Sequence, residues 1–257
     1  MKRKRLGEIR RNKETLGNYE MKIVEYNNAN DIWIEFQDEY KARVHTAYNN
    51  FKNGSVKNPY NREIYNIGYI GIGKYKTGNK DEKISKMYNT WRHMIQRCYD
   101  PYELNKHPTY IDVFVCDEWH NFQNFARWYE ENYYKCNSEE MHLDKDILIK
   151  GNKVYSSETC VFVSKRINAL FTKRQNGRGK CLIGVLWHKR DKIFEVWCQD
   201  ANCKQQYLGR FDNEKDAFHC YKQFKEKVIK QVADEYKDLI PQKLYNALYR
   251  YEVEIND

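Results

Sequence analysis

CLIGVLWHKRDKIFEVWCQDANCKQQYLGRFDNEKDAFHCYKQFKEKVI, residues 181–229, is the stretch that decides the fold of this 257-residue chain. Apolar and aromatic residues recur with a period of two across 182–188 and 193–198, and 205–209 is a third short run. This alternation predicts three strands. Asp212 stands at the expected N-cap of a helix whose apolar residues follow at helical spacing: Ala217, Tyr221, Phe224 and Val228. One helix covers one sheet face, so we expect the other face to be free.

Positive charge is concentrated in two short segments. The stretch 1–13 carries seven Lys and Arg residues against Glu8 alone, and 173–180 has no acidic residue. The whole chain has a net charge of +9 and contains 22 tyrosines. This composition favours a polyanionic partner, because cations bind phosphates and aromatic rings stack on bases. For the amino-terminal stretch, a solubilising arm is the alternative.

The stretch 181–229 resembles the APETALA-type (AP2-like) DNA-binding domain. The matching residues are Ile183-Gly184-Val185, Trp187, Phe194, Val196, Tyr207-Leu208-Gly209, Phe211, Asp216-Ala217-Phe218 and Tyr221. In that family the open sheet face enters the major groove of double-stranded DNA. The resemblance therefore implies DNA contacts by Trp187, Lys189, Arg190, Lys192, Trp197 and Arg210. A small domain whose charges are merely solvated is the structural alternative.

The basic segment 173–180 precedes this sheet directly. It has the composition of a phosphate-binding linker, and we expect its cations to strengthen DNA binding. These cations are Lys173, Arg174, Arg178 and Lys180.

The middle of the chain predicts two helices with an aromatic core. The first carries Met87, Trp91, Met94, Ile95 and Cys98 on one face and ends at Pro101, and the second starts near Asn121. We expect Trp91, Trp119 and Trp128 to be core residues and not platforms for bases. The adjacent acids Asp117 and Glu118 favour a helix start over catalysis.

One constellation between 141 and 168 indicates chemistry. MHLDKDI at 141–147 and YSSETCVFV at 155–163 predict two strands, and Ile167-Asn168 predicts a helix after them. This order resembles the ββα-metal, or HNH, nuclease motif. The resemblance implies that Asp144 and Asn168 bind one divalent metal, that Asp146 assists them, and that Asn152 is the loop residue orienting the base. Oxygen ligands suit Mg²⁺ or Mn²⁺, which would polarise the scissile phosphate.

The general base is where the sequence departs from this motif. The motif places a His directly after the metal-binding acid, whereas this chain has Lys145. A lysine with an ordinary pKa is protonated at neutral pH, so it could bind phosphate but not accept a proton. His142 lies two residues before Asp144 on the same strand face and could substitute as the base. Two alternatives stay open: an active nuclease with catalytic His142, Asp144, Lys145 and Asn152, or a degenerate motif kept for DNA binding.

The segment 17–76 predicts a small β-rich module. Strands at 21–26 and 32–36 flank a turn, and 40–46 could add a third strand. The Gly-rich segment 68–73 lacks the strand–GxGxxG–helix context of a phosphate-binding loop. We expect it to be a turn or a close-packed strand.

These segments predict a modular α+β protein. We expect a basic arm at 1–16, the β-rich module at 17–76, an HNH-like domain at 82–172, the linker at 173–180, and the APETALA-type sheet with carboxyl-terminal helices at 181–257. The order of a WxxMxxRC helix, LDKD, YSSETC and this sheet resembles bacteriophage homing-type HNH endonucleases. The resemblance implies a hydrolase that nicks or cuts double-stranded DNA in the cytoplasm, the host's if the gene is a phage gene.

Two other function classes stay open. A non-catalytic DNA-binding regulator, or an inhibitor of a host nucleoprotein, would retain a degenerate HNH fold, and Lys145 favours it. RNA binding through the Tyr-rich surface is the third alternative.

The chain shows no secretory signal and no apolar stretch of about 18 residues, so no membrane association is expected. The eight cysteines form no CxxC pair, so neither disulfides nor structural zinc is expected.

Overall fold

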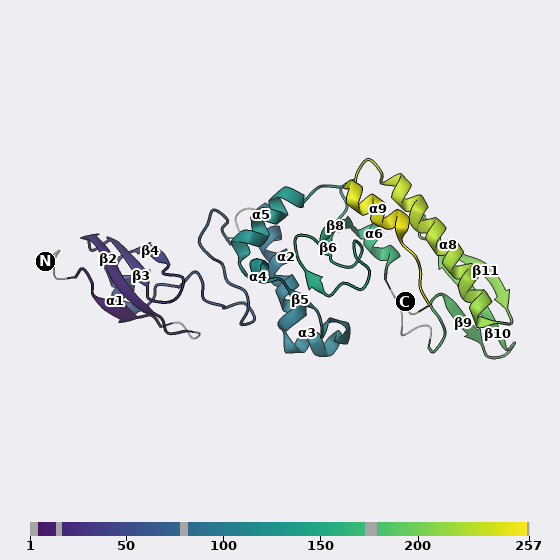
Figure 1. Cartoon of the computed structure of the whole chain (residues 1–257), viewed down its shortest axis with the longest axis horizontal. Coiled ribbons are helices and arrows are strands. Elements are labelled where there is room, and N and C mark those ends of the chain that lie inside the picture. The colour runs from purple at the N-terminus through teal and green to yellow at the C-terminus, as the bar shows by residue number, and fades with distance from the viewer. Residues whose placement is uncertain (1–4, 14–16, 78–81, 173–178, 256) are drawn as a thin grey trace. The chain divides into compact units, whose positions relative to one another are not determined.

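The computed structural model describes residues 5–13, 17–77, 82–172, 179–255 and 257. The chain forms two compact units, 1–131 with 153–157 and 132–152 with 158–257. Helices and several small separate sheets make it a modular α+β protein, as the sequence predicts (Figure 1). The segment predicted as one HNH-like domain contributes its helices to the first unit and its ββα element to the second. None of the described helices is long and apolar enough to cross a membrane.

The first unit begins with a four-stranded antiparallel sheet. Its strands are β1 (Ile9–Arg11), β2 (Glu20–Asn28), β3 (Asp31–Phe36) and β4 (Arg43–Thr46), in that order, followed by α1 (Tyr48–Asn53). One sheet face packs with Phe51 of α1 into an apolar cluster. Ile9–Arg11 was predicted as part of the basic arm, but it pairs with β2. β4 starts later than predicted because Lys41 has a positive φ of 48° and forms a turn.

The Gly-rich segment 68–73 packs closely against the helices of the first unit. Tyr69 donates its N–H to the carbonyl of His120, and Phe122 donates to the carbonyl of Tyr69. A Cβ at Gly68 would lie 2.6 Å from Ile95, and one at Gly73 would lie 2.2 Å from Gln123. Protein side chains therefore occupy the space beside these glycines, and the segment is a close-packed connection.

Helices with an aromatic core complete the first unit. The elements are α2 (Glu82–Tyr99), α3 (Pro101–Lys106), the 3-10 helix η2 (Pro108–Tyr110), β5 (Phe114–Val115), α4 (Asp117–His120), α5 (Phe122–Asn132) and β7 (Val154–Tyr155). Trp91, Trp119 and Trp128 are buried, as predicted. The indole N–H of Trp91 donates to the carbonyl of Trp119 at 2.7 Å, so the core has a fixed polar contact. β7 pairs in parallel with β5, although Tyr155 was predicted to continue the second strand of the ββα element.

The ββα element and the carboxyl-terminal helices share one core in the second unit. The antiparallel strands β6 (Met141–Asp144) and β8 (Val161–Ser164) lead into α6 (Lys165–Leu170). Their apolar side chains pack with α8 (Glu214–Glu235) and α9 (Gln242–Arg250). The cluster includes Val161, Val163, Ile167, Val228, Val232, Leu244 and Leu248. The linker predicted at 173–180 therefore does not separate two independent cores.

The predicted three-stranded sheet is present. It consists of β9 (Val185–His188), β10 (Ile193–Gln199) and β11 (Gln205–Phe211), and α8 covers one face through Ala217, Phe218 and Tyr221. β9 starts later than predicted because Gly184 has a φ of +76°. The helix cap is Asn213 and not Asp212: its side chain accepts a hydrogen bond from the N–H of Lys215 at 2.8 Å.

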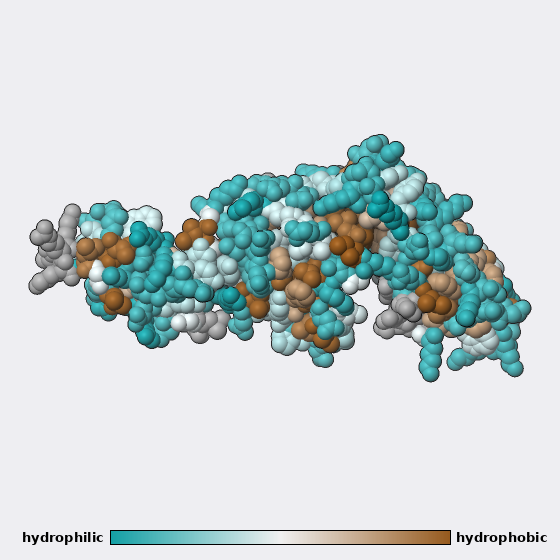
Figure 2. Space-filling model, viewed as in Figure 1, coloured by the Kyte–Doolittle hydropathy of each residue, from teal (hydrophilic) through white to brown (hydrophobic). Residues whose placement is uncertain are grey.

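Figure 2 shows hydrophilic residues over most of the visible face. Apolar residues emerge there only in separate patches. This distribution agrees with several small cores rather than one large one.

Gly184→Ala tests the contact between the sheet and α8. A Cβ at Gly184 would lie 2.0 Å from the ring of Tyr221, and φ is unfavourable for any other residue. We expect a loss of about 2–4 kcal/mol in the free energy of unfolding, measured in urea. Gly179→Ala is the control, because φ is +64° but nothing lies within 4 Å of its Cβ. Equal losses in the two variants would contradict the close approach.

Candidate metal centre and nucleic-acid interface

The ββα element brings the three predicted metal ligands into one pocket. β6 ends at Asp144, which pairs with Val161 of β8, and α6 follows β8 directly and carries Asn168 back toward this end. Asp144, Asp146 and Asn168 line a pocket of about 230 Å³. Lys150, Gly151, Phe171 and Tyr251 are also part of its lining.

The carboxylate of Asp144 is oriented by the backbone of its own loop. Oδ1 accepts hydrogen bonds from the N–H groups of Asp146 and Ile147, both at 2.7 Å. Within the described residues Oδ2 accepts none. Burial raises the pKa of Asp144, and the two backbone hydrogen bonds oppose this shift. The charged form thus lacks stabilisation that a cation in the pocket would supply.

Lys145, the residue at the general-base position, is tied into the loop. It is only 7% exposed, and its Nζ donates to Asp146 at 2.5 Å and to the carbonyl of Asn152 at 3.1 Å. The amide of Asn152 donates in return to the carbonyl of Lys145 at 2.9 Å. Neither residue lines the pocket. Asn152, which was predicted to orient the base, thus holds the backbone of Lys145. The ammonium of Lys145 forms an ion pair with Asp146.

His142 is outside the lining of the pocket as well. It lies on β6 opposite Val163, and its Nε2 is buried without a hydrogen-bond partner. This nitrogen is 3.8 Å from a carboxylate oxygen of Glu140, which permits an ion pair if the ring is protonated but is too long for a hydrogen bond. Of the four residues predicted to be catalytic, only Asp144 lines the pocket.

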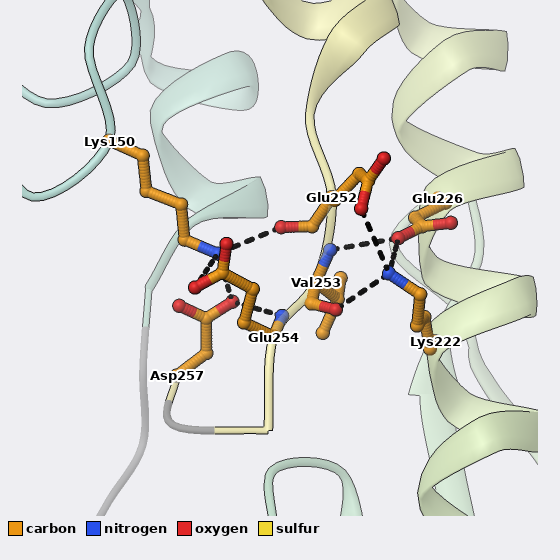
Figure 3. A network of polar contacts seen from close by, with 7 residues as sticks. All are labelled: Lys150, Lys222, Glu226, Glu252, Val253, Glu254 and Asp257. Atoms are coloured by element: carbon orange, nitrogen blue, oxygen red, sulfur yellow. Dashed lines mark hydrogen bonds and ion pairs between the residues drawn. The ribbon is translucent and has the colours of Figure 1, made fainter.

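A carboxyl-terminal segment fastens the pocket loop to α8, as Figure 3 shows. Lys150 donates to the carbonyl of Glu252 at 2.8 Å and to Asp257 at 2.9 Å. On the other side of the segment, Lys222 and Glu226 of α8 bind the backbone of Val253. Sequence analysis missed Lys150, because no local pattern links it to a partner 102 residues away.

The open sheet face carries two of the predicted DNA contacts. Val196 and Cys198 point toward α8, so alternation along β10 places Trp197 on the opposite face. Its ring lies 4.8 Å from that of its cross-strand partner Tyr207. Arg210 pairs across the strands with Glu195 at 2.8 Å. The open face therefore carries the aromatic rings of Trp197 and Tyr207, together with Arg210, whose charge Glu195 already neutralises.

Trp187 lies on the other face of the sheet. Its cross-strand partner is Phe194, at 4.6 Å between ring centroids, and Phe194 packs against the cluster under α8. Trp187 is 43% exposed, so it flanks this covered face at an edge. The six residues predicted as DNA contacts thus do not share one surface.

The remaining predicted cations lie in turns or beyond the described residues. Lys189, Arg190 and Lys192 are exposed in the β9–β10 turn, and Arg190 pairs with Asp191 at 2.9 Å. In the described part of the chain Lys189 and Lys192 have no ion-pair partner. Lys180 is exposed. Lys173, Arg174 and Arg178 lie outside the described residues.

The donor set of the pocket fits a hard cation. Asp144 offers a carboxylate oxygen and Asn168 an amide oxygen, and within the described residues neither atom is already hydrogen-bonded. Across the described ranges no three His, Cys, Asp or Glu side chains cluster as a metal site, so the candidate third ligand here is the amide of Asn168. Such oxygen ligands match Mg²⁺ or Mn²⁺. All eight cysteines are free thiols.

Comparisons of the chain with protein-family models, with curated proteins and with solved structures found no match.

Asp144→Asn tests how the pocket treats negative charge. Because the folded-state pKa of Asp144 is raised, its ionised carboxyl lowers stability at neutral pH, and this penalty is lost as the pH falls to the ordinary value of 3.8. Asn retains Oδ1 as the acceptor for both N–H groups. We expect the variant to be more stable than the wild type at pH 7. Below pH 3.8 the two proteins should be equally stable, as measured by urea unfolding. If the two proteins differed in unfolding free energy by the same amount at every pH, ionisation of Asp144 would not be the cause.

A divalent cation should favour the wild type over Asp144→Asn. Mn²⁺ at ten times its dissociation constant should stabilise the wild type by about 1.4 kcal/mol. It should leave Asp144→Asn unchanged, as seen in thermal unfolding midpoints. Asp212→Asn, which removes an exposed carboxylate, should respond like the wild type. Equal stabilisation of all three proteins would mean that Mn²⁺ binds elsewhere.

Proposed function

We propose that this chain binds double-stranded DNA and hydrolyses a phosphodiester bond with the help of a divalent metal at Asp144 and Asn168. The observation that carries the proposal is the shared pocket of Asp144, Asp146 and Asn168 on a ββα element. A divalent cation such as Mg²⁺ or Mn²⁺, when bound here, would polarise the scissile phosphate and stabilise the leaving oxygen. Oδ1 of Asp144 holds the loop, which leaves Oδ2 available as a metal ligand.

His142 is the candidate acceptor of a proton from the attacking water. It shares β6 with Asp144, and its buried Nε2 has no hydrogen-bond partner. Lys145 does not compete for this role, because its ammonium is bound to Asp146 and Asn152. The ring of His142 would have to turn toward the pocket to take up this role, since alternate strand residues are separated by about 6.6 Å.

The charge distribution supports a polyanionic partner and indicates where most of its affinity arises. Residues 1–13 have an excess of six positive charges and 173–178 an excess of three, which together equal the net charge of +9. The sheet and helices at 179–257 are nearly balanced, with 14 basic and 13 acidic residues. We therefore assign nonspecific phosphate binding mainly to the two basic segments, and orientation to the sheet.

A non-catalytic DNA-binding protein is the second candidate, favoured by a specific observation. The base position holds a lysine that the loop uses structurally, and His142 does not line the pocket. In this case the ββα element would be a scaffold, and metal binding at Asp144 would not lead to hydrolysis.

Nicking of supercoiled DNA distinguishes the two candidates. Wild-type protein should convert supercoiled plasmid to the nicked or linear form with Mg²⁺ or Mn²⁺ and not with EDTA. Asp144→Asn and Asn168→Ala should each lower the rate by about 100-fold or more while DNA affinity stays within about twofold. Asp212→Asn is the matched charge control and should nick normally. DNA binding by the wild type without nicking would select the non-catalytic candidate.

The basic linker should determine the salt dependence of DNA binding. Changing Lys173, Arg174, Arg178 and Lys180 to Ala should reduce the slope of log affinity against log salt by up to about 3.6, if each contacts one phosphate. The control removes the same charge from exposed helix and loop residues by changing Lys227, Lys230, Lys237 and Lys243 to Ala. Equal slopes for the two quadruple variants, measured by fluorescence anisotropy, would remove the linker from the interface.

A further inference from the structure

A second pocket lies at one end of the carboxyl-terminal sheet. β10 continues through Trp197–Gln199 beyond its pairing with β9, which covers only Ile193–Val196. Next to this uncovered strand edge is a pocket of about 330 Å³, with Lys225 of α8 in its lining. Thr172 lines this pocket and also the pocket of Asp144 and Asn168. The two pockets are therefore neighbours at the end of α6.

Lys225 lines this pocket, and no described residue supplies a counter-ion for its ammonium. Of the 12 described residues that line it, Lys225 is the only one with a basic side chain, and none is acidic. In the described part of the chain Lys225 has neither a hydrogen-bond nor an ion-pair partner. The adjacent Glu226 is bound to Lys222 and to the N–H of Val253. Burial lowers the pKa of Lys225, and the nearby Cys198 and Cys203 oppose this shift only in part.

The position of Lys225 in the sequence is equally unusual. It follows Tyr221 by four residues and precedes Val228 by three, and both are buried, so it occupies the core-facing stripe of α8. A cation in such a stripe costs free energy unless a partner compensates its charge. A purely structural role, in which the aliphatic stem covers apolar surface, would leave the ammonium in water.

We propose that this pocket binds a phosphate group of a DNA strand, adjacent to the phosphate placed at Asp144 and Asn168. The assignment rests on the proposed function. A phosphate supplies the missing counter-ion, and the hydroxyl of Thr172 and the amides of Gln199 and Gln205 can donate to its oxygens. Trp197 also contributes to the lining, while its ring lies on the open sheet face against Tyr207. Lys225 is thus a positioning residue that would hold the strand in register with the metal centre.

Lys225→Met removes the charge and keeps the stem. We expect the affinity for duplex DNA to fall about tenfold and the salt slope to fall by about 0.9. Lys227→Met is the control, with the same charge change at an exposed position of the same helix, and should alter affinity by less than about twofold. If the wild type binds DNA and the two variants bind equally well, the phosphate site is overturned while the proposed function stands.

Chemical labelling tests the pocket separately from DNA binding. The wild-type chain is acylated with an amine-reactive ester, and the rates at Lys225 and Lys227 are followed by mass spectrometry. Duplex DNA, and inorganic phosphate compared with chloride at equal ionic strength, should each slow labelling of Lys225 several-fold more than labelling of Lys227. If the wild type binds no DNA, the proposed function fails, and the phosphate arm decides the pocket alone. Equal acylation rates of Lys225 in phosphate and in chloride would overturn the phosphate site.

Discussion

Apolar packing between α8 and the ββα element is the contact on which the second unit depends. Two strands of four residues and a helix of six cannot bury enough surface to be stable alone. Val228, Ile229 and Val232 of α8 complete this core with Val163 and Ile167. Each such side chain contributes about 1.5–3 kcal/mol when fully buried. The geometry at Asp144 therefore exists only because a helix from far along the chain covers it.

The same helix supports the sheet. Its amino-terminal half covers Val185 and Val196 through Ala217 and Phe218, and its carboxyl-terminal half covers the ββα element. A rigid helix thus connects the surface proposed to orient DNA with the site proposed to cut it. Lys225 lies where these two apolar stretches meet, which explains how a cation can face a pocket between them.

Local order in the sequence was sufficient to predict that Asp144 and Asn168 lie close together and that the three-stranded sheet forms. Asp144 and Asn168 are joined by a short strand–loop–strand–helix segment, and strand alternation fixed the sheet faces of Trp197 and Val196. Long-range contacts were not predictable in this way. The periodicity of 214–235 shows that α8 has an apolar face, but it does not show that this face covers two different partners. The parallel pairing of β7 with β5 and the contacts of Lys150 likewise have no local signature.

The pairing of β7 with β5 has a consequence for how this chain could evolve. Five residues, Lys153–Ser157, belong to the first unit although they lie between two segments of the second. The polypeptide consequently crosses from one unit to the other three times. Recombination at a single point in the gene cannot exchange either unit as an intact block, because the inserted strand would be left without its partner Phe114–Val115. The two halves are therefore expected to be inherited together.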